Sequence, residues 1–88
     1  MTISEVKIYP FDSGEPDSSL RAFADVTLEQ TILLKGFRIL AAKNGGLFVG
    51  FPSRKGKDGK FYDMVEIKSA DLQSNLRSAI LEAYKVYA

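Results

Sequence analysis

The chain of 88 residues contains no cysteine and no histidine. Without thiols it has no disulfides and no thiolate nucleophile, and without imidazole it lacks histidine acid–base chemistry and the usual zinc ligands. No stretch is long and apolar enough to span a membrane, and Met1 to Glu5 lack the features of a secretory signal. We therefore expect a cytoplasmic protein that makes no membrane contact.

The sequence also lacks a catalytic constellation, and it is too short for an enclosed catalytic cavity with a second lobe. Asp58 and Asp63 flank a turn, where aspartate routinely caps hydrogen bonds, and Ser53 has no histidine to activate it. Residues 56–60 lack Walker spacing, and the acids of residues 12–17 lack the spacing of an EF-hand. We expect a protein that is not an enzyme, with no catalytic residues, metal, cofactor or small-molecule substrate.

Alternation of apolar and polar residues predicts strands in the first part of the chain. Residues 3–9 alternate as a half-buried strand, which Pro10 ends because proline donates no ladder hydrogen bond. Residues 12–19 are turn formers and indicate a polar loop. The next strand, residues 20–28, places its apolar side chains on one face: Leu20, Ala22, Ala24, Val26 and Leu28.

A third strand is predicted over residues 31–42, after a tight connection at Glu29-Gln30. Gly36 inside this strand indicates a β-bulge or a close approach by another backbone. Residues 32–34 are apolar on both faces. Either a helix or a second subunit is therefore expected to cover their second side.

Asn44-Gly45 is a strong turn dipeptide, so residues 47–51 are predicted to pair antiparallel with the end of the third strand. Pro52 ends that run and a basic loop follows. Asp58-Gly59 then turns the chain back into a further strand over residues 61–67. Three aromatic residues of this region are interpreted as core, where phenylalanine is most often found: Phe48, Phe51 and Phe61.

Residues 70–87 have the apolar spacing of an amphipathic helix, and Ser69 is a good N-cap. The apolar stripe is expected to cover a face of the sheet: Leu72, Leu76, Ile80, Ala83, Tyr84 and Tyr87. Arg77 and Lys85 fall elsewhere on the helix and are interpreted as a solvated face. The expected fold is one α+β domain, residues 1–88, with a small antiparallel β-sheet of about five strands covered by a C-terminal α-helix.

Positive charge is concentrated in the second part of the chain. Residues 1–34 carry two basic and six acidic side chains, a net charge of −4, and residues 35–88 carry ten basic and five acidic ones, a net charge of +5. A cluster of cations opposed only by Asp58 attracts phosphates. The candidate nucleic-acid contacts are Arg54, Lys55, Lys57 and Lys60, with Lys68 extending the patch.

Aromatic residues beside these cations, Tyr62 or Phe48, would stack on bases if they are exposed. The composition of the loop is equally typical of a solvated hairpin. The loop alone therefore leaves both interpretations open.

Three segments form a recognisable signature: Asn44 with Gly46-Leu47-Phe48-Val49, then Phe51-Pro52-Ser53-Arg54-Lys55, then Asp58-Gly59-Lys60-Phe61-Tyr62-Asp63. The signature resembles that of the stage V sporulation protein G (SpoVG) family. Further similar positions lie at residues 6–8, 22–28, 37–39 and 77–84, so the resemblance covers nearly the whole chain. It implies a small α+β fold that forms a β-mediated homodimer. It also implies a bacterial regulator that binds DNA and RNA and is linked to septation, sporulation and control of gene expression.

The sequence departs from the family pattern at three places. Gly45 is one extra residue in the turn, and Glu66-Ile67 stands where the family usually has His-Pro before the helix. The sequence ends at Ala88 without the acidic tail that many relatives carry. With no such tail, we expect no internal competitor for the basic loop.

Two hypotheses follow. The first is a dimeric nucleic-acid-binding regulator whose basic loop contacts phosphates with weak or shape-based sequence preference. The alternative is a protein-interaction module that acts on cell-division or regulatory partners, with its basic loop against an acidic surface.

Overall fold

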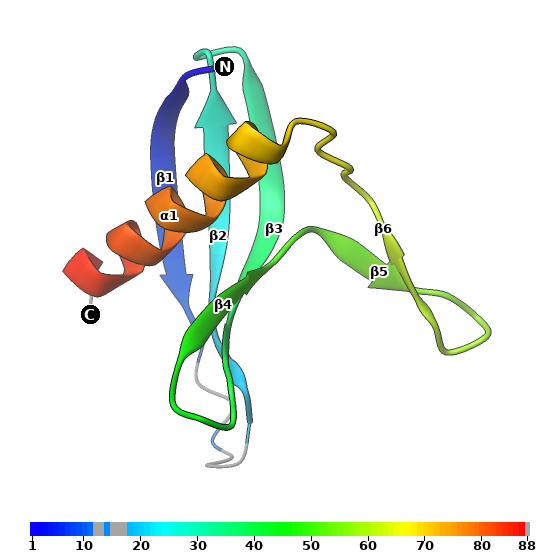
Figure 1. The fold of residues 1–88 in the computed structure, drawn as a ribbon. Helices are drawn as coiled ribbons and strands as arrows, with labels where there is room; N and C mark the ends of the chain where they lie inside the picture. Colours follow the sequence, from blue (N-terminus) through cyan, green and yellow to red (C-terminus); the bar gives the residue numbers. More distant parts are fainter. Residues whose placement is uncertain (12–13, 15–17, 88) are drawn as a thin grey trace.

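Four antiparallel strands form the main sheet of the computed structural model, which describes residues 1–11, 14 and 18–87. Their order in the sheet is the order in the chain (Figure 1): β1 (Ile3–Pro10), β2 (Leu20–Leu28), β3 (Ile32–Ala41) and β4 (Leu47–Gly50). The predicted positions of these strands are confirmed. Most of the polar loop predicted for residues 12–19 lies outside the described residues.

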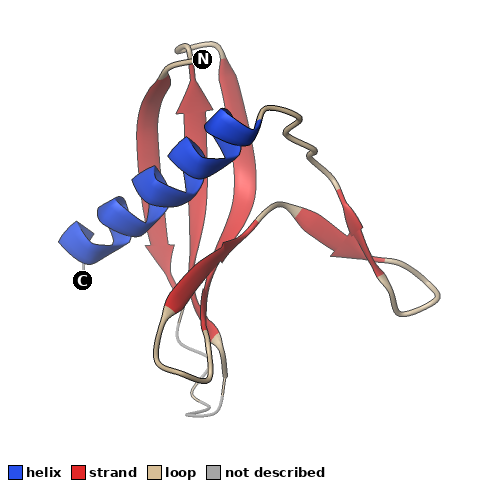
Figure 2. Ribbon diagram, in the orientation of Figure 1, coloured by secondary structure: helices blue, strands red, loops and turns tan. Residues whose placement is uncertain are grey.

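A second, two-stranded sheet follows, and one helix ends the described chain (Figure 2). Its strands, β5 (Ser53–Lys55) and β6 (Phe61–Asp63), form an antiparallel hairpin, and the helix is α1 (Ala70–Tyr87). The α+β class with a C-terminal helix is therefore confirmed. The strands of the described chain divide between two sheets.

The core lies between α1 and one face of the four-stranded sheet. Leu76 and Ile80 of the helix are buried against strand residues that are themselves inaccessible: Ala22, Ala24, Val26, Leu28, Phe37, Ile39 and Val49. The apolar face predicted for β2 is thus the centre of the core. The described part of the chain has no helix with the length and apolar character to cross a membrane.

The start of α1 is fixed by the predicted cap. The Ser69 hydroxyl oxygen accepts a hydrogen bond from the Leu72 amide at 3.1 Å, as an N-cap side chain does. The side-chain amide of Gln73 donates to the carbonyl of Ile67. The chain thereby enters the helix through Glu66-Ile67, at the place where the family usually has His-Pro.

The β2–β3 hairpin closes through Glu29 and Gln30, which both have φ of 52°. These values fit a type I′ turn, whose twist matches that of the strands, although neither residue favours positive φ. The N-terminal segment supports the turn. The Thr2 carbonyl accepts from the Glu29 amide at 2.8 Å, and the Ser4 hydroxyl oxygen accepts from the Gln30 amide at 2.8 Å.

Gly36 forms the predicted bulge in β3. The pairing with β2 shifts register between Ala24 and Val26, and Gly36 has φ of 92°, which a side chain would disfavour. The extra backbone amide is not left unpaired, because it donates to a carboxylate oxygen of Asp25 at 3.3 Å.

Two sequence predictions about the hairpin region are wrong. The strand predicted over residues 61–67 ends at Asp63, because β5 offers no further partner beyond the bond from the Met64 amide to the Pro52 carbonyl. Phe48 and Phe61 are not core residues, since they are 49% and 64% exposed. Phe48 points to the face of the sheet opposite the helix, and β6 has no covering layer.

The apolar run at residues 32–34 is covered on one side only. Leu34 packs against the core, whereas Leu33 on the opposite face is 52% exposed. The helix therefore does not cover the second side of this run.

Candidate nucleic-acid interface

The β5–β6 hairpin projects away from the main sheet and the helix (Figure 1). Its base is anchored by Arg38 of β3, whose guanidinium Nη2 donates to the Ser53 hydroxyl oxygen at 2.7 Å. The same guanidinium lies over the Phe61 ring, 5.8 Å from its centroid. The hairpin is thus attached to the domain at its base, while its turn extends into solvent.

The turn of the hairpin is closed by its own backbone. The Gly56 amide donates to the Lys60 carbonyl at 2.7 Å, and the Gly59 amide donates to the Gly56 carbonyl at 3.1 Å. A carboxylate oxygen of Asp58 accepts from the Lys60 amide at 3.0 Å. The predicted reversal at Asp58-Gly59 is confirmed, and aspartate has the capping role expected of it in turns.

Tyr62 crosses the hairpin to reach Asp58. Its hydroxyl donates to the Asp58 carboxylate, and this bond, followed by that from the Lys60 amide, lowers the pKa of Asp58. The same bond raises the pKa of Tyr62. The ring lies so close to Gly56 that a Cβ there would be 2.5 Å from Tyr62 Cε2. Glycine at position 56 therefore allows the Tyr62–Asp58 contact.

Tyr62→Phe should raise the pKa of Asp58 toward its ordinary value of 3.8, because the largest stabiliser of the carboxylate is removed. A lowered folded-state pKa stabilises the hairpin above the unfolded pKa, and that contribution is lost as pH falls through the folded pKa. An NMR titration of the Asp58 carboxyl carbon measures the shift, and Tyr84→Phe is the matched control. An unchanged Asp58 pKa in Tyr62→Phe would show that the hydroxyl contact is not formed in solution.

The hairpin brings four of the predicted site residues together. Arg54 pairs with Tyr62 on one face of the ribbon, and Lys55 pairs with Phe61 on the other. Lys57 and Lys60 lie in the turn between the two strands. All four cations are exposed, and none of them is in an ion pair within the described residues.

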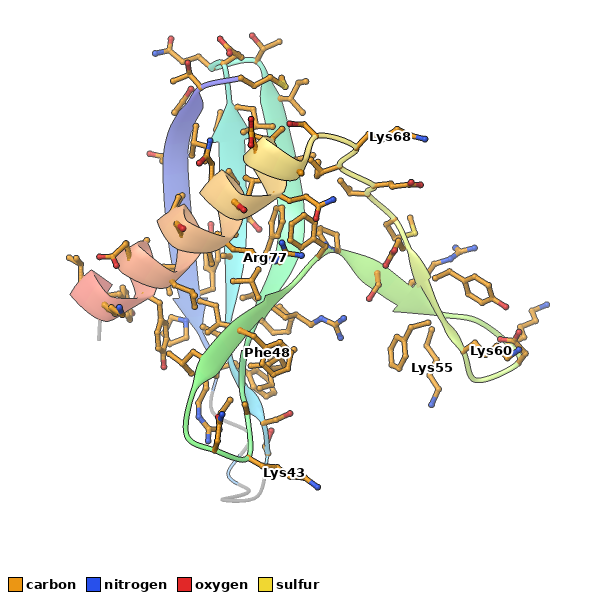
Figure 3. The ribbon with its side chains drawn as sticks, viewed as in Figure 1. Lys43, Phe48, Lys55, Lys60, Lys68 and Arg77 are labelled. Atoms are coloured by element: carbon orange, nitrogen blue, oxygen red, sulfur yellow. The ribbon has the colours of Figure 1, made fainter. Side chains whose placement is uncertain are left out.

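Lys68, the fifth predicted residue, lies elsewhere. Figure 3 shows its side chain near the entrance to α1, far from Lys55 and Lys60 at the hairpin turn. Its ammonium is 3.8 Å from a carboxylate oxygen of Glu66. The structure therefore does not join Lys68 to the cluster of the hairpin.

The two cations assigned to the helix surface are exposed as predicted, but each has a contact. The guanidinium of Arg77 lies over the Phe51 ring, 5.1 Å from its centroid. Lys85 is 3.5 Å from a carboxylate oxygen of Glu82.

Arg38, the residue that attaches the hairpin, was not predicted from the sequence. The alternation along the strand places Arg38 on the outer face, but its contacts with Ser53 and Phe61 depend on how distant segments are brought together. Over the described ranges there is no group of three or more acidic side chains arranged to hold a metal ion.

Comparisons with known proteins give a consistent result. The model of the family SpoVG matches residues 1–86. A Treponema denticola protein named "Putative septation protein SpoVG" is 32% identical over 85 residues, which cover 97% of this chain and 87% of that protein. A protein of the same name from Archaeoglobus fulgidus is 32% identical over 83 residues, covering 94% and 93% of the two chains. "Putative septation protein SpoVG 2" of Listeria monocytogenes is 32% identical over 71 residues, covering 81% and 69%.

Proposed function

Because the chain belongs to the SpoVG family, we propose that it is a cytoplasmic regulatory protein that binds DNA or RNA through the β5–β6 hairpin. The observation that carries this proposal is the cluster of four exposed cations on a projecting hairpin: Arg54, Lys55, Lys57 and Lys60. The relatives are named septation proteins. The process that this protein regulates would be septation, sporulation or gene expression.

The arrangement of the hairpin suits a phosphate backbone. Its cations have no competing carboxylate in an ion pair within the described residues, so binding a phosphate breaks no salt bridge there. Asp58 is held by Tyr62 and the Lys60 amide. Arg54 can donate two parallel hydrogen bonds to one phosphate, and the lysines act as point charges. Such contacts position a protein on nucleic acid but read no sequence, so sequence preference should be weak or based on shape.

The test is fluorescence anisotropy with labelled single strands and duplexes of mixed sequence, in DNA and RNA forms, from low to physiological salt. Binding should weaken steeply as salt rises, because each phosphate contact releases counterions. If no form binds even at low salt, the proposal is wrong. The protein-interaction module with an acidic partner surface would then be the better hypothesis.

We further propose that two copies of the chain form a homodimer through their sheets. Leu33 supports this proposal, because it lies on the helix-free face at the β2–β3 end and is more than half exposed. The neighbouring Ile32 is also exposed. A second copy of the chain that packs here would cover the second side of residues 32–34.

Leu33→Glu should convert the dimer to a monomer, because it places a charge in an apolar contact that both copies share. Sedimentation velocity at micromolar protein measures the mass. Val86→Glu, which changes an exposed apolar residue near the end of α1, is the matched control. A wild-type protein that sediments as a monomer would contradict the dimer itself, and a Leu33→Glu protein that stays dimeric would contradict this location.

A further inference from the structure

The face of the four-stranded sheet opposite α1 carries several aromatic side chains. The core occupies the other face, and α1 is the single helix of the described chain. Tyr9, Phe11 and Phe48 are each at least 40% exposed, and the first two lie beside the half-buried Phe23. Exposed aromatic rings on an open sheet are a common means of stacking on unpaired bases.

Three residues on this face, two aromatic and one arginine, lie in one row across the strands. The sheet register places Tyr9 of β1 opposite Phe23 of β2, and Phe23 opposite Arg38 of β3. Neighbouring strands are about 4.8 Å apart, so the Tyr9 and Phe23 rings start one strand apart, and the Arg38 side chain extends the row toward the hairpin, where its guanidinium lies over Phe61. Bases stack on both kinds of group.

Arg38 reaches from the row to the cationic hairpin. Gly50 pairs with Arg38 in register, and the Arg38 side chain passes beside it, since a Cβ at Gly50 would be in van der Waals contact with Arg38 Nε at 3.6 Å. The guanidinium then contacts Ser53 and the Phe61 ring. Phe61 pairs directly with Lys55. Arg38 therefore connects the aromatic row to the hairpin that carries the cations.

Phe23 is held by a neighbouring ring, and the acids on this face contact other groups. Phe11 packs edge to face on Phe23, with centroids 5.7 Å apart, which holds the Phe23 ring in place. The two acids on this face have partners, because Glu5 is 4.0 Å from Lys7 and Asp25 accepts the Gly36 amide. Two cations, Lys7 and Lys35, line the same hollow as these two acids and Tyr9, so the charges beside the row balance.

We propose that this aromatic row, defined as Tyr9, Phe23 and Arg38, binds the unpaired bases of single-stranded nucleic acid while the hairpin cations contact its phosphates. The inference rests on the proposed function and specifies its ligand as a strand with accessible bases. A duplex keeps its bases stacked internally and can contact only the cations. The protein should therefore bind single strands more tightly than duplexes of the same sequence.

The row lies apart from the proposed dimer contact. Leu33 pairs with Thr27, four residues along β2 from Phe23. At about 3.3 Å per residue, these positions are about 13 Å apart. A single strand on the row and a second subunit on Leu33 therefore do not require the same side chains.

The test is a double variant, Tyr9→Leu with Phe23→Leu, which keeps apolar side chains but removes both rings. By anisotropy its affinity for a mixed-sequence single strand should fall about tenfold or more, because stacking contributes about 1–3 kcal/mol per base. Its affinity for the duplex should stay within about twofold of wild type. Tyr87→Leu, an exposed ring on α1, is the matched control, and circular dichroism with thermal unfolding verifies the fold.

A second measurement does not depend on losing affinity. The chain has no tryptophan, so Tyr9→Trp introduces a single tryptophan that can be excited apart from the remaining tyrosines, and Tyr87→Trp is the control. Emission of Tyr9→Trp should be quenched when single-stranded DNA or RNA stacks on it, with little change for duplex. If Tyr9→Trp binds single strands without quenching, and the double variant keeps wild-type affinity, the row is not the base-binding site. The proposed function of the hairpin would be unaffected by that result. Absence of binding by wild type to any form would overturn both.

Discussion

Reversing the charge of Arg54 and Lys55 together should weaken nucleic-acid binding about 100-fold or more at physiological salt. A hydrogen bond to a charged group contributes about 1.5–3 kcal/mol, so two lost contacts account for a factor of this size before repulsion is counted. Arg54→Glu and Lys55→Glu then place two carboxylates against the phosphates. The slope of log affinity against log salt should also fall by about two on a duplex.

The location of the charge decides the interpretation of this result. Lys68→Glu with Lys85→Glu changes the net charge by the same amount, but both residues lie outside the hairpin and already face an acidic partner. This control should bind within a few-fold of wild type. Equal losses in the two double variants would mean that binding follows net charge, and the hairpin would not be the site. Because β5 and β6 are exposed and carry no core residue, the reversal should leave thermal unfolding nearly unchanged.

The parts of the fold that sequence predicted well are those with local causes. The helix was predicted with its observed bounds because its apolar spacing and the Ser69 cap are contained within one stretch. Strand β2 alternates without interruption between core and outer face. Gly36 indicated the bulge because its missing side chain permits positive φ.

The candidate site was predicted in part, because its arrangement depends on distant segments. The sequence identified the cations of the hairpin, but β5 is a three-residue strand of Ser53, Arg54 and Lys55, too short and polar to show a period. Exposure of Phe61 follows from the separation of β6 from the main sheet, which no local pattern encodes. The row of Tyr9, Phe23 and Arg38 exists only through the register of three strands. Register is set by turns and bulges together, and a shift by one residue would turn these side chains into the core.

Phe37→Ala should lower the free energy of unfolding by about 3–5 kcal/mol. Phe37 is fully buried, and truncation would leave a cavity beneath the helix. Its ring also packs edge to face on Phe51, with centroids 5.2 Å apart, and Phe51 in turn lies under Arg77 of α1. The cavity would therefore weaken the contact between sheet, helix and the base of the hairpin at the same time.

Urea unfolding followed by circular dichroism measures the effect, with Phe48→Ala as the matched control. Phe48 is half exposed on the opposite face, so the same truncation removes little buried area and should lower stability by less than about 1 kcal/mol. Domains of this size are stable by only about 5–15 kcal/mol, so Phe37→Ala should also lower the midpoint temperature of thermal unfolding. Equal losses for the two variants would contradict the burial of Phe37. If Phe37→Ala folds at low temperature but binds nucleic acid as wild type does, the hairpin is positioned by Arg38 and not through Phe51.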